Sequence, residues 1–497
     1  MLFPTAQFAL FFLIVLSISW LVRRKRVYQK LFLLAVSYFF YGWWDWRFPI
    51  LLLVSSLLDY ICGEGIVWCR RSDPERTQPV PEGAMARFLS AFPDDKRFWL
   101  LASIFFNVAL LGFFKYYNFF QENLTALAGF FGLQAHLAVL EVILPLGISF
   151  YTFQSLAYTF DLYFGHGDKA ASLLDFLLFL AFFPQLLLGP ICRSRDLLPQ
   201  LMREHPEKVP DLTRAISLIG SGLFKKVFLA TFLGTHLVND AFVAPENYSS
   251  LELLVAIYAY TAMIYCDFSG YTDLARGTGL LLGFHLPENF NAPLASTNIG
   301  EFWRRWHMSY SRWLRDYIYF PLGGSKGNPL RTYFNLFVTF LVGGLWHGAH
   351  WKFVIWGIIH AFALIGYKAS LDLRRYLGWD LKKVHPWWYL LCSWFVTFHI
   401  CALARVFFRS VDMETAGMFF SRLAELSVYG RGIELMLLLA TALGIGLNFF
   451  GRHIRVAFEW AHDRVPAFLR PVAWILVAWL LVTVKPADVA PYIYFAF

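Results

Sequence analysis

The sequence predicts an all-α polytopic membrane protein. Of its 497 residues, 58% are hydrophobic and 15% are charged, whereas a soluble domain carries roughly a quarter charged residues. A soluble core cannot hide this much apolar surface, because long chains divide into separate domains at a few hundred residues. Lipid offers no partner to a bare backbone amide, so continuous helices are expected to make the crossings.

Long apolar runs mark the expected membrane spans. Three of them, 3–22, 98–114 and 471–484, contain no charged residue and approach the ~20 residues that a hydrocarbon core requires. The other candidate spans are 31–44, 50–68, 173–188, 253–265, 333–346, 353–367, 387–406 and 435–450. Several runs contain Pro, Gly, Asp or Glu, so we expect about 11 spans together with re-entrant or interfacial helices.

The basic residues are expected to set the orientation of the chain. The first apolar run resembles a signal peptide, but no basic segment precedes it and its Arg/Lys cluster, 23–26, follows it. We therefore expect a retained helix. Cytoplasmic loops collect Lys and Arg, so this cluster and those at 70–76 and 374–383 are expected in the cytoplasm. A hairpin turning near 45–49 would join the first two clusters. Such loops account for the net charge of +9, and no nucleic-acid partner is expected.

The chain is expected to form one membrane-embedded domain over residues 1–497, because no repeat, low-complexity tail or soluble domain is evident. The lack of any pairing between its halves argues against an inverted-repeat transporter. Six cysteines are scattered without metal-ligand or disulfide spacing. They are expected to be small core residues.

Polar residues interrupt the apolar pattern in three stretches, at 144–161, 265–291 and 302–360. Ionisable groups inside a bilayer cost at least a few kcal/mol each, so they mark a cavity, a partner or a substrate. Asp267 and Asp273 either pair with Arg, Tyr or backbone donors to lock helices together or take a direct part in catalysis. Asp267 is kept as a candidate substrate-binding residue.

The stretch 302–316 holds four arginines, three tryptophans and one histidine. This composition suits an interfacial helix with Trp at the level of the headgroups. On such a helix Arg304, His307 and Ser311 would lie near one another. The arginines could instead grip an anionic ligand, because guanidinium groups bind phosphates in bidentate fashion. Arg304 and Arg305 are therefore candidate substrate-binding residues.

His347 ends an apolar run that begins at Asn335. A lone buried histidine is often a satisfied core residue, but flanking glycines, the nearby His350 and membrane depth favour a role in chemistry. A neutral imidazole acting as general base on a hydroxyl is the simplest reaction such a site allows. Asn335 and His350 are kept as supporting substrate-binding candidates. A metal site on His347, His350 and His360 is disfavoured, because no Asp, Glu or Cys nearby completes the shell.

Several motifs together resemble one family, the membrane-bound O-acyltransferases, and in particular its bacterial alginate O-acetylation branch. The resemblance runs from about residue 98 to the C-terminus, with core motifs at about 98–370. The motifs lie at 144–154, 183–190, 222–226, 267–271, 287–290, 302–307 and 344–348. Any one of them alone would be a weak signal.

The resemblance implies a helical ring around a central tunnel. It implies two catalytic histidines, His347 and His307, of which His307 stands at the family's upstream His/Asn position. It implies a cytoplasmic thioester donor, acetyl-CoA, with no bound cofactor. The acceptor would be an exopolysaccharide of the alginate or cellulose type, reached directly or through a periplasmic acetyltransferase partner. The implied setting is an exopolysaccharide acetylation complex in the lipids of the bacterial inner membrane. D-alanyl transfer to teichoic acid, or a non-catalytic transporter or synthase subunit, are the alternatives.

Overall fold

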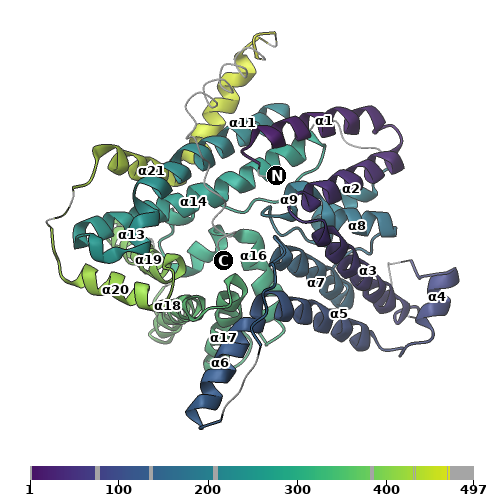
Figure 1. Cartoon of the computed structure of the whole chain (residues 1–497), viewed down its shortest axis with the longest axis horizontal. Coiled ribbons are helices and arrows are strands. Elements are labelled where there is room, and N and C mark those ends of the chain that lie inside the picture. The colour runs from purple at the N-terminus through teal and green to yellow at the C-terminus, as the bar shows by residue number, and fades with distance from the viewer. Residues whose placement is uncertain are drawn as a thin grey trace. The chain divides into compact units, whose positions relative to one another are not determined.

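The structure, a computed structural model, describes residues 3–72, 79–133, 138–204, 211–380, 385–428, 430, 432–466 and 468–470. Every regular element within these ranges is a helix, which confirms the all-α prediction (Figure 1). Contacts divide the chain into two compact units. The first comprises Met1–Leu212 and Thr278–Pro287, and the second comprises Thr213–Gly277 and Glu288–Phe497.

The first unit is a bundle of helices. In chain order its elements are α1 (Ala6–Val22), α2 (Arg26–Gly42), α3 (Arg47–Trp68), α4 (Gly83–Leu89), α5 (Lys96–Leu111), η1 (Gly112–Tyr116), α6 (Tyr117–Phe130), α7 (Ile148–Phe164), α8 (Leu173–Ala181), α9 (Phe183–Leu186) and α10 (Ser194–Met202). The hairpin expected near 45–49 is present between α2 and α3. The side chain of Asp45 accepts the backbone N–H of Arg47 at 2.9 Å at the start of α3.

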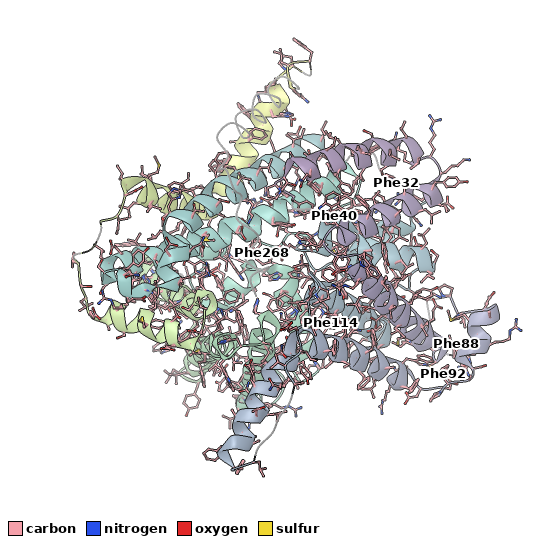
Figure 2. All side chains as sticks on the ribbon, viewed as in Figure 1. Phe32, Phe40, Phe88, Phe92, Phe114 and Phe268 are labelled. Atoms are coloured by element: carbon pink, nitrogen blue, oxygen red, sulfur yellow. The ribbon has the colours of Figure 1, made fainter. Side chains whose placement is uncertain are left out.

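Aromatic packing and buried polar contacts both stabilise this unit. Phe40 on α2, which is labelled in Figure 2, packs against Phe183 with ring centroids 5.6 Å apart. Where α3, α5 and α7 meet, the fully buried carboxylate of Asp59 accepts hydrogen bonds from Ser103 and Asn107. Ser155 of α7 donates to the same carboxylate. A polar group buried in an apolar bundle is tolerated when its hydrogen bonds are made within the bundle.

The second unit holds the remaining helices. Its elements are α11 (Leu212–Leu223), η2 (Phe224–Ala230), α12 (Thr231–Leu233), η3 (Gly234–Val238), α13 (Asn239–Val243), η4 (Pro245–Asn247), α14 (Ser250–Leu281, whose last turn belongs to the first unit), η5 (Pro293–Ala295), α15 (Ile299–Arg305), α16 (Met308–Leu314), η6 (Arg315–Tyr319), α17 (Pro329–His347), α18 (Trp351–Tyr376), α19 (Trp387–Arg409), α20 (Met413–Ala424) and α21 (Leu435–Arg464).

Two glycines bring α17 and α18 into backbone contact. A Cβ added at Gly344 would lie 2.4 Å from the carbonyl oxygen of Phe353 and 3.1 Å from the Cα of Gly357. Small residues allow this close approach of helices in a membrane, where packing replaces the hydrophobic effect as the driving force. The contact fixes the C-terminal end of α17 against the N-terminal half of α18.

Seven helices among the described residues are long and apolar enough to cross a membrane. Six of them overlap predicted spans, whereas the helical stretch Leu212–Val243 was not predicted as a span. The count of about 11 is not confirmed by these residues. The predicted span 173–188 is broken into α8 and α9, because Phe182 leaves the helical conformation. The predicted span 471–484 lies outside the described residues, as do parts of the basic clusters at 70–76 and 374–383.

The prediction of one continuous interfacial helix over residues 302–316 is wrong. The chain forms α15, breaks at Trp306 and His307, and resumes as α16. His307 adopts a left-handed conformation with φ 43°, which a continuous right-handed helix does not allow. Arg304, His307 and Ser311 therefore do not share one helical face.

Candidate active site

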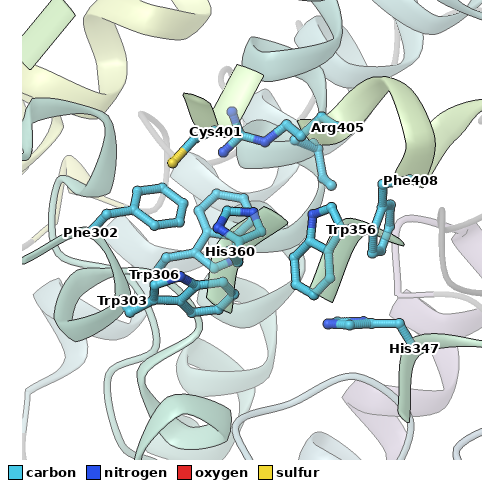
Figure 3. A pocket seen from close by; sticks show the side chains of 10 residues that line it. Phe302, Trp303, Trp306, His347, Trp356, His360, Cys401, Arg405 and Phe408 are labelled. Atoms are coloured by element: carbon cyan, nitrogen blue, oxygen red, sulfur yellow. The ribbon is translucent and has the colours of Figure 1, made fainter. Parts of the chain in front are cut away.

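A small cavity of about 20 Å³ opens within the second unit. Figure 3 shows the side chains that reach it from α15, α18 and α19 and from the end of α17. The residues that line the cavity are Ile264, Phe302, Trp303, Trp306, His347, Trp356, His360, Cys401, Arg405 and Phe408. Most of these side chains are aromatic or aliphatic, so the few polar groups act in surroundings of low dielectric, where each is stronger than in water.

His347 reaches the cavity from the last position of α17. Its side chain is 4% exposed, and its ring meets Trp356 edge-to-face at 4.8 Å and Phe408 at 5.1 Å. Gly348, which follows it, leaves no room for a side chain, because an added Cβ would lie 2.2 Å from the ring of Phe353. The helix end and the aromatic walls together fix the direction of the imidazole.

His307 lies at the break between α15 and α16 and is completely buried. Its Nδ1 lies 3.2 Å from Oδ1 of Asn289. The same Oδ1 accepts the backbone N–H of Ser309 at 3.0 Å, and the carbonyl of Asn289 accepts the backbone N–H of Met308 at 2.9 Å. Asn289 therefore holds both the backbone and the side chain of the segment that carries His307.

These hydrogen bonds indicate which ring nitrogen of His307 carries the proton. A backbone N–H can only donate, so the contact with Ser309 fixes which end of the Asn289 amide is the oxygen. An oxygen can only accept, so Nδ1 of His307 carries the proton and Nε2 carries a lone pair. No hydrogen-bond partner of Nε2 exists among the described residues. Burial lowers the pKa of His307 to about 3, so the ring is neutral at physiological pH.

Tyr310 connects the two predicted catalytic histidines. Its ring stacks on His307 with centroids 4.9 Å apart and lies 5.4 Å from the ring of His347. The hydroxyl of Tyr310 donates to the carbonyl of Gly343 at 2.7 Å, which ties α16 to α17. The ring centroids of His307 and His347 therefore lie no farther apart than the sum of their distances to the ring of Tyr310. The sequence-based prediction had placed them together only through the family resemblance.

Two further polar side chains line the cavity and were not predicted as site residues. His360 of α18 is 2% exposed and its ring packs between Trp303, at 5.1 Å, and Trp356, at 4.7 Å. Arg405 of α19 is 4% exposed. His360 had been considered only as a metal ligand. Arg405 lies in the predicted span 387–406, where an ionisable group inside an apolar run was the available signal.

The structure does not bring the predicted arginines into the cavity. Arg304 is exposed, and Arg305 forms an ion pair with Glu301 one turn earlier, at 2.6 Å. Asn335 is buried and donates to the carbonyl of Gly324 at 3.0 Å, which anchors a loop to α17. His350 accepts the backbone N–H of Lys352 at 3.2 Å at the start of α18. None of these four candidate residues is among those lining the cavity.

Asp267 is paired within the protein. Its buried carboxylate forms an ion pair with Lys226, and Asp273 pairs with Lys225 at 2.5 Å. The expected locking of helices is present, since these pairs join η2 to α14, although the partners are lysines and not arginines. Asp267 does not line the cavity, and its role in substrate binding stays a prediction.

No group of three or more His, Cys, Asp or Glu side chains suitable for a metal ion occurs within the described ranges. His347 and His360 line one cavity, and His350 instead caps α18. Cys401 is the one cysteine on the cavity wall and is buried there as a free thiol.

Comparison with known proteins connects this site to a family. The sequence model of the membrane-bound O-acyltransferase family matches residues 98–408, which include every residue of the site. The chain belongs to this family. It is therefore a multi-pass membrane protein and an O-acyltransferase. The resemblance seen in the sequence motifs is confirmed.

Individual relatives of this acyltransferase carry more specific names. The "probable alginate O-acetylase" of Pseudomonas syringae pv. tomato is 36% identical over 418 residues, covering 84% of this chain and 74% of the relative. The peptidoglycan O-acetyltransferase of Helicobacter pylori is 34% identical over 446 residues, covering 84% and 78%. The teichoic acid D-alanyltransferase of Bacillus subtilis is 30% identical over 263 residues, covering 51% and 66%.

Proposed function

We propose that this acyltransferase transfers an acetyl group from acetyl-CoA, which reaches it from the cytoplasm, to a hydroxyl of an exopolysaccharide of the alginate or cellulose type. The acceptor is the sugar itself or a periplasmic acetyltransferase that passes the group onward. The protein would act in the inner membrane of a bacterium, within an exopolysaccharide acetylation complex. Two relatives named as polysaccharide O-acetyltransferases over 84% of the chain support this proposal.

The placement of His347 is the observation that carries the proposed chemistry. It is a buried imidazole at a helix end, facing a cavity with apolar walls. In the reaction, His347 takes the proton from the attacking hydroxyl as general base. The hydroxyl oxygen then bonds to the thioester carbonyl carbon, the carbon–sulfur bond breaks, and the thiol leaves with a proton returned from His347. Removing water from such a cavity also protects the thioester from hydrolysis.

His307 supports this chemistry as an acceptor and not as a donor. Its Nδ1–H is used by Asn289, so its Nε2 can accept a hydrogen bond or relay a proton but cannot donate a hydrogen bond to a carbonyl oxygen. We therefore propose that His307 orients the acceptor hydroxyl or relays its proton, and that another group polarises the thioester.

The test compares the O-acetyl content of the exopolysaccharide in cells that produce the wild type, His347→Ala or His453→Ala at equal membrane levels. His453 is an exposed histidine on α21 and serves as the matched control. Loss of acetyl groups only in His347→Ala, with the polymer still secreted, supports the proposal. Normal acetylation in His347→Ala refutes the role of His347, and altered secretion with acetylation per sugar unchanged indicates a transporter.

D-alanyl transfer to teichoic acid is the second candidate function. The relative with that activity in its name covers half of this chain at 30% identity, which is a more distant match. Incorporation of D-alanine in place of acetyl groups in the same cells would favour it.

A further inference from the structure

Arg405 is a buried cation on the wall of the cavity. Within the described parts of the chain, no carboxylate oxygen lies within 4.0 Å of its guanidinium. The one hydrogen bond that it makes to a described residue, from Nη1 to the hydroxyl of Thr261, is long at 3.3 Å. The guanidinium also lies over the rings of Trp306 and Phe302, at 5.1 Å and 5.8 Å.

Among the residues that the structure describes, these contacts leave most of the donors of the guanidinium unused. Arginine carries five N–H groups and no acceptor, and one of the five is engaged by Thr261. Aromatic faces compensate part of the cost of burying the charge, but a buried charge is normally also paired or hydrogen-bonded. Because Arg405 lines the cavity, the remaining donors are available to a molecule that enters it.

Arg405 of α19 and His347 of α17 line the same cavity. Phe408, three residues after Arg405, lies on the same face of α19 and packs against the ring of His347 with centroids 5.1 Å apart. All three residues line the cavity, as Figure 3 shows. The base and the guanidinium therefore both face the cavity in which the reacting groups would bind.

The proposed reaction needs a hydrogen-bond donor at this place. Attack on the thioester converts its carbonyl oxygen into an oxyanion, and donors aimed at that oxygen are usually the largest electrostatic contribution to acyl transfer. His307 cannot supply such a donor, because its Nε2 carries no proton and its Nδ1–H is used by Asn289.

We propose that Arg405 binds the carbonyl oxygen of the acyl thioester and stabilises the negative charge that develops on it. This inference rests on the proposed function. As the hydroxyl oxygen bonds to the carbonyl carbon, its proton passes to His347 and the carbonyl electron pair moves onto the oxygen held by Arg405. When the carbonyl re-forms, the carbon–sulfur bond breaks, the electron pair leaves with sulfur, and His347 returns the proton to give the thiol and the ester.

The test uses inside-out membrane vesicles from the producing cells, which expose the cytoplasmic face to radiolabelled acetyl-CoA. Arg405→Ala is expected to lower kcat by about 10²- to 10³-fold, as for loss of an oxyanion donor, while KM for acetyl-CoA changes by less than about threefold. Guanidinium ion at millimolar concentration, far below denaturing levels, is expected to restore roughly tenfold in kcat by occupying the vacated position.

The matched control is Arg409→Ala, which removes an arginine one turn further along α19 that donates to Asn239 at 2.8 Å and does not line the cavity. Its kcat is expected to stay within about threefold of the wild type, with no response to guanidinium ion. His347→Ala is expected to be inactive and equally unresponsive.

Wild-type kcat in Arg405→Ala, or a loss that guanidinium ion does not relieve, overturns the proposal. If the Arg405→Ala variant fails to accumulate in the membrane, the kinetics of the Arg405→Lys variant provide the test instead. A fall of about tenfold or more in kcat at unchanged KM supports the role, because a lysine cannot reproduce the planar fork, and wild-type kcat overturns it. Failure of the wild type to use acetyl-CoA, or activity in His347→Ala, would instead refute the underlying function.

Discussion

Replacing Gly344 by alanine is expected to disable the enzyme without touching any group that reacts. The new methyl group would lie 2.4 Å from the carbonyl oxygen of Phe353, where ordinary contact begins at 3.4 Å. The oxygen belongs to the backbone of α18, so no side chain can rotate away to relieve the overlap. The two helices must therefore separate by about 1 Å at this level.

The separation would act directly on the site geometry. Gly344 lies one turn before His347 on α17, and α18 carries Trp356 and His360 on the cavity wall. A displacement of about 1 Å between reacting groups can cost on the order of 10²-fold in rate, while overpacking costs about 1–3 kcal/mol of stability. Activity is therefore expected to fall by about a hundredfold while the protein still inserts and folds.

The assay measures O-acetyl groups per sugar and the acetyl-CoA kinetics of vesicles, with each variant normalised to its amount in the membrane. Gly366→Ala on α18 is the matched control, because an added Cβ there meets no atom within 4 Å and alanine is the better helix former. Its activity is expected to equal that of the wild type. A Gly344→Ala enzyme within about threefold of the wild type would refute the reasoning that this helix contact sets the position of His347.

Three further outcomes are expected. Asn289→Leu removes the acceptor that holds His307 and should lower acetylation by roughly tenfold or more at equal protein levels; unchanged acetylation would show that this contact is dispensable. Lys226→Met leaves the buried carboxylate of Asp267 without its ion-pair partner, at a cost of roughly 3–5 kcal/mol. The melting temperature in detergent should fall more in Lys226→Met than in the Lys226→Met/Asp267→Asn double variant, and the reverse order would contradict the pairing. Because the pKa of His307 is about 3 in the fold and 6.5 in the unfolded chain, the unfolded state binds more protons between these values, and stability falls as the pH drops from 6.5. His307→Asn should lose less melting temperature than the wild type between pH 6.5 and about pH 4.5, and an equal loss would refute the assignment.

Hydrophobicity along the chain predicted the membrane class and most helices, because a lipid-facing helix must be apolar over its whole length. It failed for Leu212–Val243, where Lys225 and Lys226 interrupt the apolar run. Both lysines are buried and paired with aspartates from α14. The sequence contains all four residues, but pairing between segments is a tertiary property that a local pattern does not reveal.

Only part of the candidate site could be predicted, because the rest also depends on tertiary packing. The motif resemblance identified His347 and His307, and the structure brings both to the ring of Tyr310. Arg305 and Asn335 were chosen for residue type alone, and the structure gives them partners away from the cavity. Arg405 was overlooked although its charge inside an apolar run was a signal, because the sequence does not show which face of α19 turns toward α18.

The left-handed backbone at His307 has a consequence for how this enzyme can vary. Among residues with a side chain, asparagine, aspartate and histidine enter that conformation most readily, whereas other residues are disfavoured there by about 1–2 kcal/mol. A replacement must satisfy this conformational restriction and must also be neutral and polar in a fully buried position. Asparagine meets both demands and aspartate only the first, so a library randomised at this one codon should return histidine and asparagine in its functional fraction and almost nothing else.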